Sequence, residues 1–364
     1  AANRRFFDEG VTHIHLARFN ANCLIILLVS TFLVLCVLLF TRVFFASYIG
    51  IPVVWIYLGV LCAFCTFILN LRLGQWQIRG KAKVYGVLQV TNSSIALLFS
   101  LLFVVFLHLG PDGRVYGIVV TSLLVGLVSF YTLISDKLFL FEYNKQDIRE
   151  ALSYGLPLIP HVLGAFLLLS VDRLVINKEL GLEMTGIYMV AFSLGSALNI
   201  IFSSINNAFS PWLFGQLKEN DEERKRNIVK KTYVYFVFLI LMSLLAFFVA
   251  PSILKLIVGE KFHQAADILP ILIIGQVFVG MYFMVTNYIF YVKKTKYLSY
   301  VTISSGAINV TLLLVLIPYY GIEGAAFSFL IASFWQFICT WIVSAKLYPM
   351  PWFIFNVRSY KKEI

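Results

Sequence analysis

The sequence is a succession of long apolar runs separated by short polar segments, and the length of the runs predicts membrane-spanning helices. An α-helix rises about 1.5 Å per residue, so about 20 apolar residues cover the ~30 Å hydrocarbon core of a bilayer. Ten runs have roughly this length, which predicts an all-α polytopic membrane protein. The predicted spans are residues 21–44, 51–71, 84–107, 115–135, 154–177, 185–210, 232–250, 268–292, 298–317 and 323–345.

The composition supports a membrane protein and excludes an ordinary soluble one. Hydrophobic residues make up 60% of the 364 residues and charged residues only 13%, whereas a soluble domain is about a quarter charged. A net charge of +11 could indicate a nucleic-acid partner. Because the basic residues lie mainly in the short segments between apolar runs, we expect no nucleic acid.

The basic residues are distributed unequally between the two sides of the predicted spans. Of the 29 Lys and Arg residues, 23 lie in segments on one side, including six between Lys218 and Lys231. Arg173 lies within a span, and the other side holds Arg42, Arg114, Lys178, Lys255 and Lys261. Because basic loops stay on the cytoplasmic side, both termini of this chain are expected in the cytoplasm.

Two pairs of short motifs indicate an internal repeat. The sequence Lys-Ala-Lys at 81–83 precedes the third span, and Lys-Thr-Lys at 294–296 precedes the ninth. Paired glycines at 113–117 and 321–324 accompany the fourth and tenth spans. Membrane transporters are often built from such repeats. We expect two helical lobes, residues 1–150 with four spans and residues 151–364 with six.

The stretch from Gly155 to Ala191 carries the most distinctive motifs. It contains GLPLIP at its start, DRLVI from Asp172, and the pattern G-x-x-x-x-G-I-Y-x-x-A from Gly181. These motifs resemble the start of the second half of the Wzx-type oligosaccharide flippases. These polysaccharide biosynthesis proteins share a superfamily with the lipid II flippases and the MATE drug exporters. The resemblance extends over nearly the whole chain.

The resemblance implies a fold of twelve spans, with six in each lobe. Spans seven to ten of this chain repeat spans one to four, which leaves spans five and six without a partner in the first lobe. Arg5-Phe6-Phe7 resembles the cytoplasmic end of the second span of the family. We therefore expect that this chain lacks about the first two helices of a MATE-like fold.

The resemblance also implies a function. A flippase of this family moves a polyprenyl-pyrophosphate-linked oligosaccharide across the bacterial inner membrane by alternating access of two lobes, for O-antigen, capsule or exopolysaccharide synthesis. Its expected partners are the lipid-linked oligosaccharide, membrane lipids, and a glycan polymerase or glycosyltransferases of the pathway. A MATE-like cation/drug antiporter and a lipid II flippase are alternatives. A membrane polysaccharide polymerase is a weaker one, because the longest outer segment, about residues 250–268, is short.

Ionisable residues in the fifth predicted span are candidates for a substrate or coupling-ion cavity. Such groups cost at least ~2.5–3.5 kcal/mol at the centre of a membrane helix. His161 and Asp172 are eleven residues apart and would share one helix face, with Arg173 next to Asp172. This face could line a cavity. Alternatively, Asp172 pairs with a basic neighbour, Arg173 extends to the interface, and His161 bonds to another helix.

A polar stripe runs along the sixth predicted span. Its members recur every three or four residues and are Ser196, Asn199, Ser203, Asn206 and Ser210. Exposure of this face to lipid would be costly, so it lines a cavity or packs against another helix. The ninth span has a weaker copy that includes Asn309, and the family resemblance adds Arg5 to the candidate cavity residues.

The sequence contains none of the motifs that would indicate an enzyme. It has no G-x-S-x-G, H-E-x-x-H or P-loop pattern. Cys62 and Cys65 lie inside an apolar run, where they are expected to be buried small residues. We therefore expect no catalysis, no cofactor and no metal site.

The predicted topology can be tested by cysteine accessibility in a cysteine-free background. Because the Lys218–Lys231 segment is expected in the cytoplasm and Lys261 on the outer side, a membrane-impermeant thiol reagent added to spheroplasts should label Lys261→Cys and not Asn220→Cys. Labelling of Asn220→Cys from outside would contradict the topology.

Overall fold

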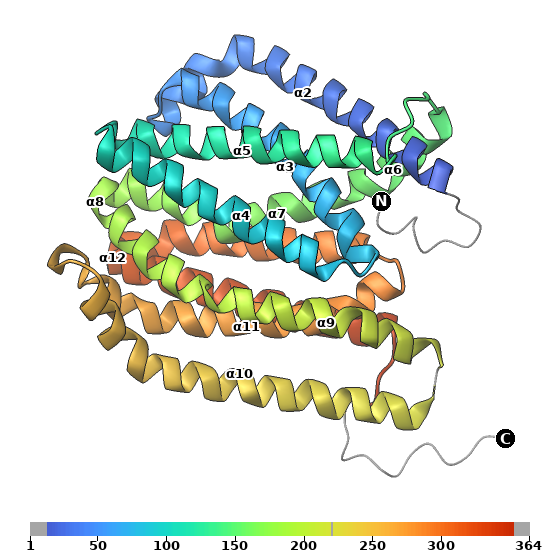
Figure 1. Ribbon diagram of the computed structural model, residues 1–364. Helices are drawn as coiled ribbons and strands as arrows, with labels where there is room; N and C mark the ends of the chain where they lie inside the picture. Colours follow the sequence, from blue (N-terminus) through green and yellow to red (C-terminus); the bar gives the residue numbers. More distant parts are fainter. Residues whose placement is uncertain (1–12, 220, 353–364) are drawn as a thin grey trace. The chain divides into compact units, whose positions relative to one another are not determined.

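The protein is helical over the part that the computed structural model describes, residues 13–219 and 221–352 (Figure 1). The long helices are α2 (His13–Ile49), α3 (Val53–Ile78), α4 (Ala82–Leu101), α5 (Gly110–Ser135), α8 (Val171–Ser196), α9 (Leu198–Lys218), α10 (Glu222–Ile257), α11 (Ala265–Tyr291) and α12 (Lys296–Leu347). The shorter elements are the π-helical turn η1 (Leu102–Phe106), α6 (Lys145–Gly155), η2 (Leu156–Leu158), α7 (Ile159–Leu169) and η3 (Glu260–Phe262). Eight helical segments in this part of the chain are long and apolar enough to cross a membrane, which confirms the expected all-α polytopic membrane fold.

The α8 segment turns back on itself at Gly181. This glycine has φ 85° and ψ 175°, far from helical values. The hydroxyl of Tyr188 donates a hydrogen bond of 2.6 Å to Oδ2 of Asp172. In a straight helix, residues 16 positions apart would be separated by about 24 Å. The arms before and after Gly181 therefore run side by side.

The α12 segment reverses in the same way at Gly321, where φ is 56° and ψ is −135°. Nε1 of Trp335 donates a hydrogen bond of 3.2 Å to Oγ of Ser304, although 31 residues of straight helix would span about 46 Å. A residue with a Cβ is disfavoured at such a positive φ, which explains glycine at both turns. Each of these two segments thus supplies two arms of a hairpin.

The ten predicted spans fall on these helices and hairpin arms, but two details of the prediction were wrong. The fifth span is not one continuous helix, because Ser170, with φ −140°, interrupts it between α7 and α8. The second span does not end at residue 71, since α3 continues to Ile78. Arg72, expected in a polar connecting segment, instead has a buried side chain.

Internal contacts divide the chain into two compact units, with the boundary between Leu156 and Pro157. Unit 1 contains the helices from α2 to α6, and unit 2 contains those from α7 to α12. Immediately after the boundary, the carbonyl oxygen of Pro157 accepts a hydrogen bond of 2.7 Å from Oγ of Ser299 on α12. The first residues of unit 2 are thereby bonded to one of its long helices.

The last part of unit 1 is bonded to the first turns of α2. Nδ2 of Asn22 donates to the carbonyl oxygen of Glu142 at 2.9 Å, and the amide of Asn144 donates to Oδ1 of Asn22 at 3.0 Å. Arg18 forms an ion pair of 2.9 Å with Asp147, whose side chain is almost fully buried. These bonds hold α6, up to Gly155, as part of unit 1.

The internal repeat is visible in how α3 and α11 end. Gly80 and Lys293 follow these helices with φ values of 67° and 60°. In each case the next amide, of Lys81 or Lys294, donates to the carbonyl five residues earlier, at 2.9 and 3.2 Å. Both ends are therefore Schellman caps, in which a left-handed residue closes the last turn of a helix.

A second repeated turn follows in each unit. Gly110 and Gly321 have φ values of 55° and 56°. Three residues later, a Cβ on Gly113 or Gly324 would lie 2.8 or 2.5 Å from the backbone of the preceding helix. The structure thus pairs Gly110 with Gly321, a register slightly different from the one predicted from the sequence.

Helix α7 crosses α12 with the two backbones in close contact. A Cβ on Gly164 would collide with the backbone of Thr302, and one on Gly306 would lie 2.8 Å from the carbonyl oxygen of Gly164. In a membrane, small residues at a helix crossing allow the dispersion contacts and polar bonds that hold helices together. This crossing fixes α7 in unit 2.

Replacing Gly164 should separate the two helices. Ala normally favours a helix over Gly by about 0.5–1 kcal/mol, but overpacking costs about 1–3 kcal/mol. Gly164→Ala should therefore lower the thermal unfolding midpoint of the purified protein. Gly215→Ala is the control, because it also lies in a helix but has open space around it. Equal midpoints for the two variants would contradict the close crossing.

Candidate functional site

Asp172 is bonded from two sides inside unit 2. Its Oδ2 accepts the hydroxyl of Tyr188 at 2.6 Å, and its Oδ1 accepts the amide of Arg173 at 2.8 Å. The side chains of Asp172 and Tyr188 are essentially inaccessible to solvent. A carboxylate in this position stabilises the α8 hairpin, since its two hydrogen bonds replace the water that it loses.

Arg173 lies half-buried beside this pair. Its guanidinium carbon is 5.2 Å from the centre of the Phe192 ring, a cation–π distance. Its Nε is buried and has no hydrogen-bond partner among the described residues. Of the two ionisable neighbours, Arg173 therefore keeps unused hydrogen-bonding capacity, whereas Asp172 has a donor at each oxygen.

His161 contacts a different helix from Asp172. Its Nδ1 is 2.9 Å from Oγ1 of Thr302, and that hydroxyl also donates to the carbonyl of Leu298 at 2.8 Å. When the hydroxyl hydrogen is used in the second bond, Nδ1 of His161 carries the hydrogen in the first. In a neutral ring, Nε2 is then the acceptor nitrogen.

The polar stripe of the sixth predicted span is used in two ways. The amide of Asn199 donates to Oε1 of Gln276 at 2.6 Å, and the amide of Asn287 donates to Oδ1 of Asn206 at 2.8 Å. Both bonds join α9 to α11. Ser196 and Ser203, by contrast, bond only to carbonyl oxygens of their own helical segment. These side chains of the stripe, Ser196, Asn199, Ser203 and Asn206, are all half-exposed.

Asn309 caps the end of α7. Its Nδ2 donates to the carbonyl oxygens of Leu167 and Leu168 at 2.9 and 3.3 Å. The last carbonyls of a helix have no partner within it, and the break at Ser170 leaves those of α7 in the interior. Asn309 is fully buried and satisfies them.

The break at Ser170 also separates the two residues predicted to form one stripe. The structure brings Asp172 to Tyr188 and His161 to Thr302, and it records no direct bond between Asp172 and His161. The sequence interpretation gave no role to Tyr188 or Gln276, although Tyr188 belongs to the GIY motif, and it placed Thr302 only in the weaker polar stripe of the ninth span. The predicted site residue Arg5 lies outside the described residues.

Unit 1 holds a buried cation that the sequence interpretation assigned to a loop. Arg72 forms an ion pair with Asp136. Its guanidinium carbon lies 4.0 Å from the centre of the Trp76 ring. A buried arginine requires such partners, and this pair joins the ends of α3 and α5.

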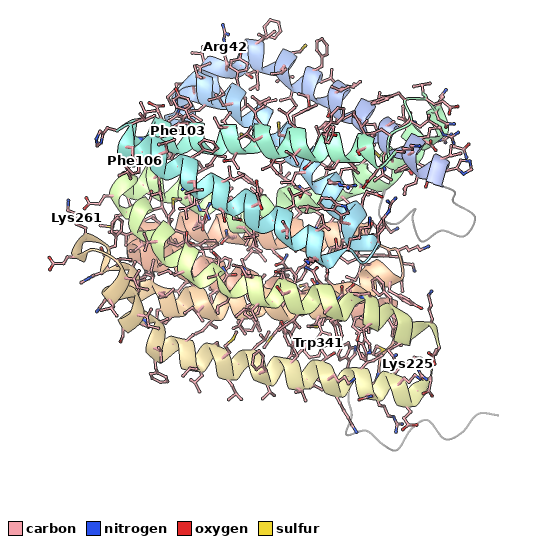
Figure 2. All side chains as sticks on the ribbon, in the orientation of Figure 1. Arg42, Phe103, Phe106, Lys225, Lys261 and Trp341 are labelled. Atoms are coloured by element: carbon pink, nitrogen blue, oxygen red, sulfur yellow. The ribbon has the colours of Figure 1, made fainter. Side chains whose placement is uncertain are left out.

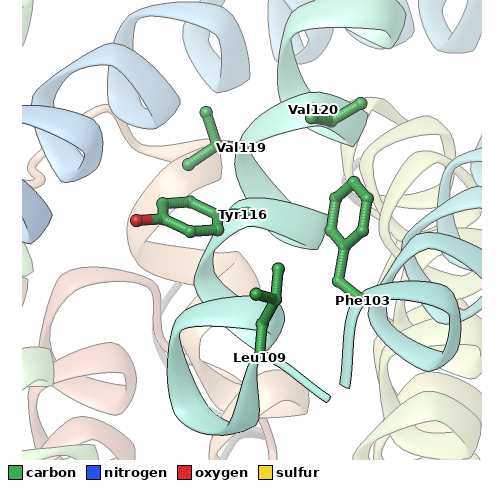
Figure 3. A pocket seen from close by; sticks show the side chains of 5 residues that line it. All are labelled: Phe103, Leu109, Tyr116, Val119 and Val120. Carbon is green, nitrogen blue, oxygen red and sulfur yellow. The ribbon is translucent and has the colours of Figure 1, made fainter. Parts of the chain in front are cut away.

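A pocket of about 290 Å³ also lies in unit 1 (Figure 3). Its lining is apolar and consists of Phe103, Leu109, Tyr116, Val119 and Val120. None of the predicted site residues lines it. The groups that could hold a sugar or phosphate by hydrogen bonds therefore lie elsewhere in the chain. In the described part, no cluster of His, Cys, Asp and Glu could hold a metal ion.

The fold is that of a MATE-type membrane transporter. A solved MATE transporter in complex with MaL6 is 14% identical, with a TM-score of 0.69 over 91% of this chain and 79% of the transporter. One from Vibrio cholerae is 16% identical, with a TM-score of 0.64 over 91% of this chain and 79% of its own. A transporter of the MOP superfamily from Pyrococcus furiosus is 15% identical, with a TM-score of 0.68 over 95% of this chain and 81% of its own.

Within that fold class, the chain belongs to the family of polysaccharide biosynthesis proteins, which matches residues 18–267. It is 24% identical to Lsg locus putative protein 1 of Haemophilus influenzae over 272 residues, 71% of this chain and 67% of the relative. It is 21% identical to the amylovoran biosynthesis protein AmsL of Erwinia amylovora over 237 residues, 61% of this chain and 60% of the relative. The family expected from the motifs between Gly155 and Ala191 is thereby confirmed.

The bond between Tyr188 and Asp172 should contribute to stability. Tyr188→Phe removes the hydroxyl and leaves one oxygen of a buried carboxylate without a donor, which costs about 1–3 kcal/mol. We expect a lower unfolding midpoint in detergent. Tyr300→Phe is the control, because Tyr300 is 68% exposed. If both variants unfold at the wild-type temperature, the bond does not hold the hairpin.

Proposed function

We propose that this protein is a flippase that moves a polyprenyl-pyrophosphate-linked oligosaccharide from the inner to the outer leaflet of the bacterial inner membrane. The product supplies a surface polysaccharide such as O-antigen, capsule or exopolysaccharide. Two helical units would expose the substrate path alternately to the two sides of the membrane. Both termini of this chain would be cytoplasmic. No covalent bond is made or broken, and no cofactor or metal is needed.

The observation that carries this proposal is the combination of a polysaccharide biosynthesis family with a transporter fold. Residues 18–267 match the family, while the MATE-like fold extends over 95% of the chain. A biosynthetic pathway for a surface glycan needs a transport step, because its lipid-linked precursor is assembled on one side of the membrane and used on the other. A relative named for amylovoran biosynthesis supports a glycan as the substrate.

We assign the half-exposed face of α9 to the substrate path. Ser196, Asn199, Ser203 and Asn206 lie along this face and offer hydroxyl and amide groups that suit sugar hydroxyls. Arg173, whose Nε has no partner among the described residues, is the candidate cation on α8 for a pyrophosphate.

The other candidate residues support the structure around the path in this proposal. His161 and Asn309 hold α7 against α12. Asp172 keeps the α8 hairpin closed and would act on a coupling ion only after losing the Tyr188 bond. Arg5 would contribute at the cytoplasmic end, as the family resemblance implies.

The function can be tested in a strain that lacks the gene and makes a labelled lipid-linked oligosaccharide. Spheroplasts are treated with a membrane-impermeant reagent that oxidises glycans. We expect the oligosaccharide to be synthesised but protected in the deletion strain, and to become accessible when the full-length gene is restored. Equal accessibility in both strains would contradict a flippase. If the oligosaccharide of the deletion strain is accessible but not polymerised, the protein is a polymerase instead.

Two further readouts distinguish the transporter alternatives. A drug antiporter predicts unchanged glycan and greater drug sensitivity, and a lipid II flippase predicts loss of peptidoglycan synthesis. The α9 assignment is tested in the same strain by Ser203→Ile, which should lower accessibility at normal protein level. Ser204→Ile, one residue further round the helix, is the matched control. Equal effects of the two variants would remove the stripe from the substrate path.

A further inference from the structure

The basic residues at the start of α10 fall into two groups with different surroundings. Arg224 forms an ion pair of 2.7 Å with Glu219, and Lys225 forms one of 2.8 Å with Glu222. These two cations are therefore neutralised locally. They lie at the end of α10 that is marked by Lys225 in Figure 2, opposite the end that leads to Lys261.

The second group consists of Arg226, Lys230 and Lys231. All three are exposed, and no carboxylate within the described ranges 13–219 and 221–352 forms an ion pair with them. Arg226 and Lys230 are four residues apart, so they lie one above the other on a helix face, and Lys231 lies beside them. Three uncompensated positive charges are thus gathered on two turns of one helix.

The same face of α10 continues directly as a strongly exposed apolar stripe. Its residues follow the basic group at helical spacing and are 55–70% exposed: Val234, Val237, Leu241, Leu245 and Phe248. Because α10 is apolar and long enough to span a membrane, an exposed stripe of this kind faces hydrocarbon. The basic group therefore lies where the hydrocarbon gives way to the headgroup layer.

A tryptophan lies at this boundary. Nζ of Lys231 is 4.5 Å from the centre of the Trp212 ring, which belongs to the neighbouring helix α9. Tryptophan prefers the membrane interface because its ring is apolar and its N–H is polar. The contact also holds the Lys231 ammonium above the ring face, where the cation is favoured.

We propose that Arg226, Lys230, Lys231 and Trp212 form a binding site for an anionic phospholipid. The phosphate and any further anionic headgroup would bind to the three cations, the glycerol region would lie against Trp212, and the acyl chains would follow the apolar stripe. An acidic protein surface matches the charges but not the stripe. The cations, the interfacial ring and the apolar stripe follow one another in space. This order matches one molecule that is anionic at one end and hydrocarbon at the other.

This inference is independent of the transported substrate, because the site uses the outer face of α10 together with Trp212, and none of the candidate path residues Ser196, Asn199, Ser203 and Asn206. Each lysine or arginine near an anionic membrane surface strengthens binding about fivefold. Removing all three unpaired charges should therefore weaken lipid binding by about a hundredfold. Removing the two paired charges should have little effect, because their carboxylate partners already neutralise them.

The test uses the purified full chain in an uncharged detergent, titrated with phosphatidylglycerol or phosphatidylcholine while the thermal unfolding midpoint is measured. Phosphatidylglycerol should raise the midpoint, and phosphatidylcholine and soluble glycerol phosphate should not. The triple variant Arg226→Gln, Lys230→Gln, Lys231→Gln should need about a hundredfold more phosphatidylglycerol. The matched double variant Arg224→Gln, Lys225→Gln should respond as the wild type does.

A second measurement covers the case in which the triple variant does not fold. In vesicles containing brominated phosphatidylglycerol, fluorescence of Trp212, obtained by subtracting the Trp212→Phe protein, should be quenched, and Lys230→Gln alone should reduce this quenching. The proposal is overturned by equal stabilisation with phosphatidylcholine, by equal weakening in the double variant, or by quenching that is insensitive to Lys230→Gln.

Discussion

Several polar side chains buried among the helices of unit 2 form hydrogen bonds with one another, because the hydrocarbon around the unit offers no hydrogen-bond partner. The hydrogen bond from the Tyr188 hydroxyl to Asp172 holds the two arms of the α8 hairpin together. The Asn199 amide on Gln276 then joins α9 to α11. In a membrane an apolar side chain gains little by contacting another helix instead of lipid, so the hydrophobic effect gives little preference for one helix arrangement over another. These few directed bonds, together with the crossing at Gly164, therefore select the arrangement of helices.

The two units build the same turns with different side chains. Both Schellman caps have a left-handed residue, but it is Gly80 in unit 1 and Lys293 in unit 2. A residue with a Cβ costs roughly 1–2 kcal/mol in this conformation, so the hydrogen bonds of the second cap must offset that cost. The repeat is therefore preserved in backbone geometry at a position where the residue type is not. Local hydrogen bonding can retain a shared architecture after the sequence signal has weakened.

Hydrophobic run length was sufficient to predict the fold class and the helices, because a membrane imposes a fixed span length and a fixed cost for polar groups. The family followed from the motifs between Gly155 and Ala191. Periodicity was not sufficient for the site. It assumes an uninterrupted helix, and the non-helical Ser170 breaks the phase between His161 and Asp172. Periodicity also cannot tell which residues of different helices meet. The partners Gln276 and Thr302 are therefore known only from the three-dimensional structure. The prediction put Arg72 in a loop because a charge alone favours exposure to water. In the structure, Asp136 and Trp76 stabilise its buried guanidinium.

The bonds on either side of the unit boundary limit the freedom of the joint between the units. Before the boundary, Glu142 and Asp147 are bonded to α2 through Asn22 and Arg18, and α6 continues to Gly155. After the boundary, Pro157 is bonded to α12 through Ser299. Only Leu156 lies between the end of α6 and Pro157, and two residue steps reach roughly 7 Å at full extension. The two units are therefore joined by a short connection and not by a long flexible linker. Whatever arrangement the two units adopt elsewhere, the end of α6 and the start of α7 stay within roughly 7 Å of each other along the backbone.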